Sequence, residues 1–393
     1  MALTLTRVPD MADFYLKAKE IFTEDKIIHN AFMGISNGLI VSIGDRPGRN
    51  DNVVDLGDGK IVPGFIDIHI HGSGGFDVMD ASYEALNTIS TAIAANGVTG
   101  FLGTTVTSSW DATICALKNI HECFSIGLKG AELLGAYSEG LFFSDQFKGA
   151  HASEYFLAPT QDRLDAMLGA TGGKLKVLAI APELEGAIDA IRYLTKKGIK
   201  VMVGHTGATY QQSKAAFDAG AVGGVHIFNQ MLALHHRQPG TVGAILHNRD
   251  TFAELIADGV HVDPVIMDLV YRLKGVDKTA LITDCICAAG LGDGVYKLGL
   301  LAVTVTNGVA RTHTGALAGS TLVLNKAVAN MIKLVGACEL DAVHMASLTP
   351  ATLLGLDKET GSIKENKRAN LAVLNDNYDV SMTFVDGNVV YQH

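Results

Sequence analysis

The chain has 393 residues, a formal net charge of −10 and a hydrophobic fraction of 48%. That length can bury one large core together with a smaller second domain. The acidic balance argues against a general nucleic-acid or membrane-surface protein, because phosphate contacts need clustered lysine and arginine side chains. One small phosphorylated ligand stays compatible with this charge, since a few local donors suffice to hold it.

Neither the cysteines nor the first residues point to export. The five cysteines match no disulfide framework and no CxxC zinc motif, which favours a reducing compartment. The N-terminal stretch lacks the apolar core of a secretory signal, and no apolar run approaches the ~20 residues of a membrane helix. We therefore expect a soluble, cytoplasmic protein.

The two ends of the chain have the character of β-hairpins. Short apolar stretches alternate with Asn-Gly and Asp-Gly turns in residues 14–64, and the same pattern returns in residues 361–393. Because chain termini commonly lie close together, we expect residues 1–61 and 357–393 to form one small β-sandwich domain. Two independent β-caps are the alternative.

The central residues, 62–356, alternate apolar strand candidates with helix-like segments such as 185–198 and 210–220. Each strand candidate ends in polar or glycine positions, as parallel strands buried on both faces should. The pattern predicts an α/β fold with a (β/α)8 barrel of the TIM type. A doubly wound open sheet is the alternative, but no GxGxxG motif follows the first strand. The strand candidates are residues 64–72, 99–106, 132–140, 176–183, 200–206, 223–229, 253–262 and 280–285.

Histidines and acidic residues stand at the ends of most of these strands. In a parallel barrel the carboxyl ends of all strands lie on one face, where active sites form, so these side chains should converge. Imidazole and carboxylate together suit zinc, iron or manganese. Glu183, at the end of the fourth strand, is a candidate supporting residue. The candidate site residues are His69, His71, Glu139, His205, His226, Asp258, His261 and Asp284.

No single member of this set is decisive. His69 and His71 can point to the same side of a strand because they are two positions apart, yet a lone His-x-His pair is a weak signal. His205 or His226 alone would more often be a hydrogen-bonded core histidine, and Asp284 alone could cap a turn. The metal-site prediction therefore depends on the coincidence of these residues at five of the eight strand ends.

A series of short motifs occurs in the order found in one enzyme family. The motifs are PGFIDIHIHG, SEG followed by KGAH, GHTGAT, VHIFNQM, RQPG, ADGVHVD, LITD and LAGS, and they extend over nearly the whole chain. In this set and order the sequence resembles the N-acetylglucosamine-6-phosphate deacetylases of the amidohydrolase superfamily.

The resemblance implies a metal centre with named ligands. Glu139, His205 and His226 match the three protein ligands of the main catalytic metal. His69 and His71 match positions that complete a second metal site in those members that have His-x-His. One or two divalent metals per chain are therefore implied, with zinc as the first choice and iron, manganese or cobalt as alternatives.

The resemblance also implies the reaction, which is hydrolysis of N-acetyl-D-glucosamine 6-phosphate to D-glucosamine 6-phosphate and acetate. Asp284 matches the catalytic carboxylate that moves the proton, and His261 is placed to polarise the amide carbonyl. Arg237 matches the phosphate-binding arginine, which can reach the neighbouring site in a family that is typically homodimeric. The positions that match substrate contacts are Ala150, His151, Asn229, Gln230, Arg237, Asp258, His261, Leu317, Ala318 and Gly319.

The sequence departs from the family pattern after the third strand. Tyr137 and Leu141 replace the histidine and proline of the common His-x-Glu-Gly-Pro, and KGAHAS replaces KGAHNP. We expect these changes to lie near the sugar, which leaves N-acetylgalactosamine 6-phosphate as the nearest alternative substrate. A cyclic-amide hydrolase is disfavoured because no lysine ends a strand, and a non-catalytic sugar-phosphate sensor is disfavoured because Asp284 is intact.

Overall fold

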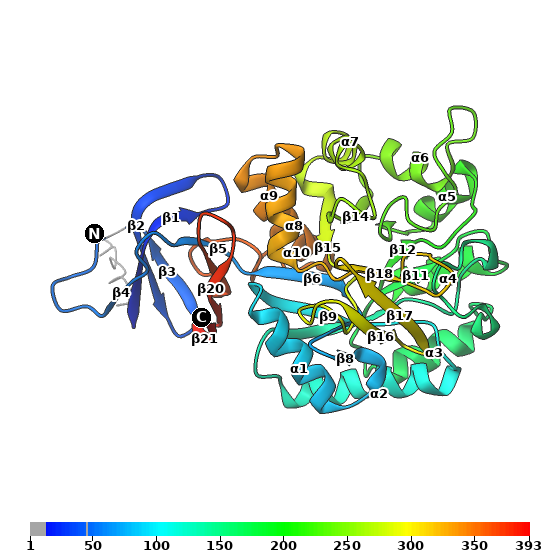
Figure 1. Ribbon diagram of the computed structural model, residues 1–393, viewed down its shortest axis with the longest axis horizontal. Helices are drawn as coiled ribbons and strands as arrows, with labels where there is room; N and C mark the ends of the chain where they lie inside the picture. Colours follow the sequence, from blue (N-terminus) through cyan, green and yellow to red (C-terminus); the bar gives the residue numbers. More distant parts are fainter. Residues whose placement is uncertain (1–12, 45) are drawn as a thin grey trace, which may run out of the picture.

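The computed structural model describes residues 13–44 and 46–393, and its larger part is a closed parallel barrel, to the right in Figure 1. The first and last barrel strands meet where the backbone N–H of Asp284 donates to the carbonyl of His69 (2.9 Å), which closes the ring. All eight strands predicted for the centre of the chain are present. They are β6 (Phe65–Ile70), β9 (Val98–Thr105), β10 (Glu132–Ser138), β11 (Leu175–Ile180), β12 (Lys200–Val203), β13 (Gly223–Gly224), β14 (Phe252–Ile256) and β15 (Thr279–Ile282).

Apolar side chains fill both sides of the barrel wall. Phe101 packs outward among the helices, whereas its neighbour Leu102 belongs to the cluster inside the barrel. Val177 and Leu178 divide between the inner and outer clusters in the same way. Successive residues of a strand point to opposite faces, so a strand buried on both faces needs the near-continuous apolar runs seen in the sequence.

Helices cover the outside of the barrel, and several of them begin at a side-chain cap. Thr209 and Gln212 form a capping box at the start of one helix, and Asp263 caps another directly before Pro264. The helices are α1 (Tyr83–Ala94), α2 (Trp110–Ile126), α3 (Gln161–Ala170), α4 (Ala187–Lys196), α5 (Tyr210–Asp218), α6 (Gly240–His247), α7 (Pro264–Lys274), α8 (Leu324–Asn330), α9 (Glu339–Ala346) and α10 (Leu348–Leu354), with a π-helical turn at Met331–Val335.

Both ends of the chain build one mixed β-sheet, to the left in Figure 1. An Asn37-Gly38 turn joins two of its strands, and both residues have the positive φ (50° and 76°) that such a tight hairpin requires. The strands pair in one continuous order, β21-β20-β19-β5-β1-β2-β3, with β4 also on β1. Their bounds are β1 (Phe14–Phe22), β2 (Ile27–Ser36), β3 (Leu39–Ile43), β4 (Val53–Asp55), β5 (Lys60–Pro63), β19 (Leu371–Leu374), β20 (Val380–Val385) and β21 (Asn388–Gln392).

Ion pairs fasten this sheet to the barrel. Arg368 contacts Asp386 through two hydrogen bonds (2.5 and 2.7 Å) and reaches Glu132 of β10 at 2.8 Å. Lys60 of β5 donates to Glu339 at the start of α9 (2.9 Å). The small domain is therefore held against the end of the barrel by charged groups that are partly shielded from solvent.

Short β-hairpins lie at the carboxyl face of the barrel. A three-stranded sheet follows β15 and packs its own apolar cluster against residues near that face. The short strands are β7 (Gly72–Ser73) with β8 (Phe76–Asp77), and β16 (Gly294–Leu298), β17 (Leu301–Thr306) and β18 (Val309–Arg311).

None of the helices in the described part of the chain has the length and apolarity that a membrane crossing demands.

Candidate active site

Glu139 lies among several imidazoles at the carboxyl end of the barrel. It follows β10, and only 3% of it is exposed. Its Oε1 is 3.1 Å from Nε2 of His226 and 3.3 Å from Nε2 of His205. Its Oε2 is 3.1 Å from Nε2 of His71 and 3.6 Å from Nε2 of His151. Strand ends that are far apart in the sequence thus meet at one carboxylate.

Asp284 follows β15 and completes the group. Its Oδ1 is 3.1 Å from Nε2 of His71 and 3.6 Å from Nε2 of His69. These three residues form one buried set of potential metal ligands, and Glu139, His151 and His205 form another. The predicted ligands therefore lie together, with donor atoms for a binuclear site of the kind that amidohydrolases have.

Three of these side chains extend from backbone in the left-handed region. The φ angles are +47° for His205, +21° for His226 and +49° for Asp284. Such conformations are uncommon outside glycine and cost about 1–3 kcal/mol each. Strain gathered at strand ends that carry chemical groups indicates that the fold maintains these positions for function.

Hydrogen bonds on the far side of the rings orient their lone pairs into the centre. Nδ1 of His205 lies 2.9 Å from the carbonyl of Phe147, and Nδ1 of His71 lies 3.3 Å from the carbonyl of Thr104. A neutral ring that donates from Nδ1 turns the lone pair of Nε2 toward Glu139, and this is repulsive unless a cation lies between them. The residues therefore fit a divalent metal.

His151 is oriented in the opposite sense. The backbone N–H of Thr107 donates to its Nδ1 (3.4 Å), and the Thr107 hydroxyl is 2.7 Å from the same atom. Burial, followed by the charge of His205, lowers the pKa of His151 to about 3, so the ring is neutral. Its hydrogen is then on Nε2. His151 offers an N–H to the site, which suits substrate contact better than metal ligation.

Both carboxylates of the group are ionised. Burial raises the pKa of Glu139, but the surrounding imidazoles together lower it well below its usual range. Burial likewise raises the pKa of Asp284, but the neighbouring imidazoles, His71 first among them, bring it down to about 2. Asp284 is therefore a carboxylate at neutral pH and can accept a proton.

A cavity adjoins this group, and most of the predicted substrate residues line it. Ala318 instead belongs to the buried cluster under the β16–β18 hairpin. Asp258 reaches the cavity only through its bonded neighbour His261. The lining residues are His71, Val106, Glu139, Gly149, Ala150, His151, His205, His226, Asn229, Gln230, His261, Asp284, Leu298, Leu317 and Gly319.

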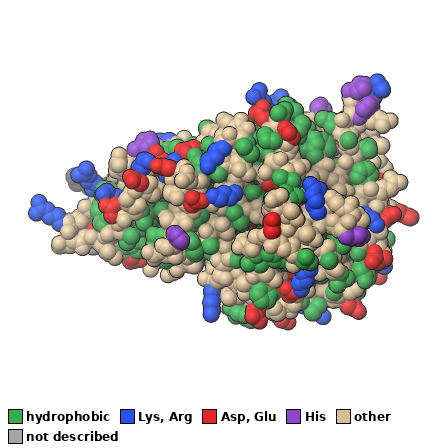
Figure 2. All heavy atoms as spheres, in the orientation of Figure 1, with side chains coloured by type: hydrophobic (Ala, Val, Ile, Leu, Met, Phe, Trp, Pro, Cys, Tyr) green, Lys and Arg blue, Asp and Glu red, His purple; other side chains and the backbone are tan. Residues whose placement is uncertain are grey.

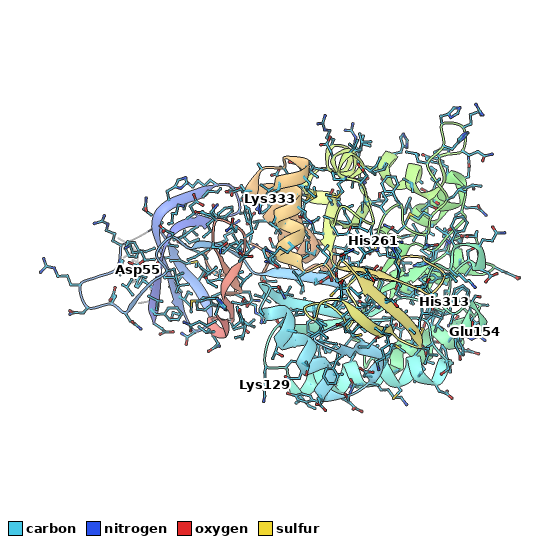
Figure 3. The ribbon with its side chains drawn as sticks, in the orientation of Figure 1. Asp55, Lys129, Glu154, His261, His313 and Lys333 are labelled. Carbon is cyan, nitrogen blue, oxygen red and sulfur yellow. The ribbon has the colours of Figure 1, made fainter. Side chains whose placement is uncertain are left out.

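Asp258 and His261 form a tight pair beside the cavity. Nδ1 of His261 is 2.7 Å from Oδ2 of Asp258, and Oδ1 accepts the backbone N–H groups of Val260 and His261 (2.8 Å each). Burial raises the pKa of Asp258, but its bonds with His261 lower it more. Asp258 therefore fixes the orientation of the His261 ring through Nδ1 and leaves Nε2 uncommitted by this pair. Figure 3 labels His261, which also borders a second cavity at the β17–β18 turn.

Arg237 lies outside this cavity within a single chain. It sits on the exposed loop before α6, where its Nη1 is 2.7 Å from Nε2 of His236. Figure 2 shows histidine and basic side chains gathered on a projection at the upper right, in the region of this loop. Arg237 therefore does not contribute to the wall of the cavity in its own chain.

The departures from the family motif lie behind the ligands. Tyr137 is fully buried, and its ring is 4.7 Å from the ring of His69. Leu141 is also buried, and its backbone N–H donates to Thr107 (3.3 Å). Neither residue is part of the cavity wall, so the expectation that these changes lie near the sugar does not hold for these two.

Two supporting carboxylates stand beside the ligands. Glu183, a candidate from the sequence, accepts the backbone N–H of Gly207 (2.8 Å) and so steadies the loop that carries His205. Glu254 of β14 was not among the predicted residues, although its Oε2 is 3.0 Å from Nδ1 of His69. The available signal was an acidic residue inside an otherwise apolar strand.

Comparison with known proteins agrees with this geometry. The family model described as the amidohydrolase family matches residues 61–390. The chain is 42% identical to the N-acetylglucosamine-6-phosphate deacetylase of Vibrio furnissii, over 90% of this chain and 89% of that protein. It is 41% identical to the N-acetylgalactosamine-6-phosphate deacetylase of Escherichia coli O157:H7, over 95% and 98%.

A solved structure gives the same result in three dimensions. The N-acetyl-D-glucosamine-6-phosphate deacetylase of Mycobacterium smegmatis, a mutant in complex with N-acetyl-D-glucosamine-6-phosphate, superposes with a TM-score of 0.92 at 31% identity. The match covers 97% of this chain and all of that one. The chain therefore belongs to the amidohydrolase family, among the relatives of the N-acetylglucosamine-6-phosphate deacetylases.

Proposed function

We propose that this protein hydrolyses the N-acetyl group of N-acetyl-D-glucosamine 6-phosphate to give D-glucosamine 6-phosphate and acetate. The observation that carries the proposal is the meeting of Asp284 and His261 with the Glu139 imidazole group at one cavity. The 42% identity to a deacetylase of this name supports the substrate. The reaction would serve the breakdown of amino sugars.

The ligand group would hold one or two divalent metals. Glu139, His205 and His226 would bind the main one, and His69 with His71 would contribute to a second. A divalent metal supplies Lewis acidity there, which lowers the pKa of water toward neutrality and polarises the acetyl carbonyl. Zinc suits imidazole and carboxylate donors best, while iron, manganese and cobalt fit the same donors. Elemental analysis of the purified protein would identify the metal.

Asp284 is the proposed proton carrier. As an ionised carboxylate beside the ligand group, it accepts a proton from the attacking water while the water oxygen bonds to the carbonyl carbon. It then returns that proton to the amide nitrogen as the C–N bond breaks. The second proton of the water passes from the new carboxylic acid to the amine, so acetate and the ammonium form of the sugar leave and atoms and charge balance without any other reactant.

His261 would stabilise the oxygen that becomes negative during this attack. Its Nδ1–H is committed to Asp258, so only the protonated ring can donate from Nε2 to the carbonyl oxygen. A charge-assisted donor of this kind is roughly twice as strong as a neutral one. Asp258 therefore contributes to substrate polarisation through His261, and its own contact with substrate would be indirect.

The 6-phosphate would be bound by His151, by backbone amides and by Arg237 of a second subunit. An exposed apolar stripe supports a homodimer, because Val265, Leu269 and Leu273 recur every four residues along one face of α7. Leu234, beside the Arg237 loop, lines the same surface groove as Leu273. Exposed apolar patches of this kind commonly mark interfaces.

A complementation experiment tests the shared site. Arg237→Ala and Asp284→Asn subunits should each be nearly inactive as homodimers. After mixing and subunit exchange, activity should return, because one site of the mixed dimer receives an intact Asp284 and an intact Arg237. Exchange of subunits without recovery of activity would show that Arg237 does not act across the interface.

N-acetylgalactosamine 6-phosphate is the second candidate substrate. The 41% identity to a deacetylase named for that sugar almost equals the 42% identity to the deacetylase named for the glucosamine form. Acetate release from both sugar phosphates, measured as kcat/KM, ranks the two. We expect the glucosamine form to react faster. A higher value for the galactosamine form would reverse the assignment, and release from neither would remove both.

The proposed cellular location is the cytoplasm. A reducing cytoplasmic compartment agrees with five cysteines that are all unpaired in the described chain.

The domain limits proposed are residues 1–61 with 357–393 for the small β-domain and 62–356 for the catalytic barrel. Limited proteolysis followed by mass spectrometry would test them, because cleavage should concentrate at the connections between the two parts.

A further inference from the structure

The barrel interior contains a carboxylate for which the reaction described above has no use. Glu254 points inward from β14 and is fully buried. Its Oε2 lies 3.0 Å from Nδ1 of His69 and 3.2 Å from the backbone nitrogen of His226. Its Oε1 has no hydrogen-bond partner. A buried carboxylate of this kind costs several kcal/mol unless a positive or donating partner compensates it.

The contact with His69 fixes which nitrogen of that ring faces the site. The same Oε2 already accepts the backbone N–H of His226, so it faces His69 as an acceptor and Nδ1 of that ring carries the hydrogen. The lone pair of Nε2 then points toward Glu139 and Asp284, each 3.6 Å away. Nε2 itself is buried and has no hydrogen-bond partner in the described structure. The ring is therefore held as a metal ligand would be, with its donor atom unused.

The contact with His226 acts on the backbone. The N–H of His226 donates to the same Oε2, and this residue has the strained φ of +21°. One oxygen atom thus connects the end of β6 to the turn after β13, on the two sides of the ligand group. Tyr137 packs against the His69 ring from within the same inner layer and limits its rotation.

We propose that Glu254 is a positioning residue for metal binding. It fixes the tautomer of His69, raises the basicity of that ligand, and holds His226 at the distance that the shared site requires. The proposal depends on the metal site of the proposed function but not on its substrate. Carboxylates that accept from a ligating histidine typically strengthen metal affinity by 10–100-fold.

Metal affinity, measured without substrate, tests this role. Metal-free protein is titrated with zinc in competition with a chromophoric chelator. Glu254→Gln keeps the shape and one accepting oxygen but removes the charge, and Glu254→Leu removes both. His69→Ala identifies which of the bound zinc equivalents per chain depends on His69. Thr251→Val is the matched control, because it removes buried hydrogen bonds to Ile245 and Asn248 at the opposite end of the same strand.

The expected result is a graded loss. The zinc equivalent that His69→Ala abolishes should weaken by 10–100-fold in Glu254→Gln and more in Glu254→Leu. Thr251→Val should lower the melting temperature of the metal-free protein and leave zinc affinity unchanged. Equal affinity in wild type and Glu254→Gln would overturn the proposal, as would a wild type that holds no His69-dependent equivalent. Neither result bears on the deacetylase assignment, which the acetate-release assay tests separately.

Discussion

Replacing Asp284 by asparagine removes the carboxylate that transfers the proton while it keeps the size of the side chain. Asn is nearly isosteric with Asp and is among the few residues that tolerate the left-handed φ of +49° found here, so the fold should be kept. The amide cannot accept and return a proton as the carboxylate does. General acid–base groups contribute roughly 10²–10⁴-fold, which is about 3–5 kcal/mol of activation free energy. We expect kcat to fall by that factor.

The assay combines acetate release with elemental analysis and thermal unfolding. At least one metal per chain should remain, because Glu139, His205 and His226 are unchanged, and the melting temperature should stay close to that of wild type. Asp284→Ala serves as the structural comparison, since alanine at this φ adds strain of about 1–3 kcal/mol. If Asp284→Asn keeps its metal and retains more than a tenth of wild-type kcat, Asp284 is not the proton carrier.

Three further predictions concern metal count, phosphate recognition and the joint between the domains. His69→Ala should reduce the metal content from about two per chain toward one, and an unchanged count would give His69 a structural role. Arg237→Ala should raise KM for the phosphorylated sugar far more than for N-acetylglucosamine, and equal effects on both would show that Arg237 does not bind phosphate. Lys60→Met should destabilise the protein by about 3 kcal/mol, because it leaves Glu339 and Glu20 without their buried cation. Burial lowers the pKa of Lys60, but the hydrogen bond and charge of Glu339 and the charge of Glu20 raise it above 10.5. The stability that Lys60 adds is therefore present below pH 10.5 and is lost as the pH rises through the higher folded-state pKa. Urea unfolding of both proteins at neutral and alkaline pH measures this difference, and a difference that does not change with pH would refute the ion-pair explanation.

The barrel and its ligands could be predicted because each strand carries its own signal. A buried parallel strand is an apolar run, and a ligand is a histidine or acid at the end of that run. The length of β13 is less well predicted by its sequence pattern. The sequence predicts a strand over residues 223–229, but the regular strand covers only Gly223–Gly224, because His226 and Phe228 adopt positive φ (21° and 77°) and turn the chain into the site.

Contacts between distant segments were harder to foresee. Glu254 sits within a short apolar strand, and nothing local indicates that its carboxylate meets His69, which is 185 residues away in the sequence. Arg237 lies on an exposed loop outside the cavity, so its motif predicts a role that only the proposed second subunit would explain. The domain limits at residues 61 and 357 stay predictions, since the sheet and the barrel share continuous chain.

The proposed reaction is cleavage of the acetyl amide of an N-acetylhexosamine 6-phosphate by water. The most direct measurement incubates the metal-loaded protein with N-acetyl-D-glucosamine 6-phosphate in water enriched in oxygen-18 and analyses both products by mass spectrometry. We expect one heavy oxygen in each acetate, none added to the sugar, and equal amounts of acetate and free amine. Heavy oxygen in the sugar product, or no acetate from either hexosamine phosphate, would contradict it.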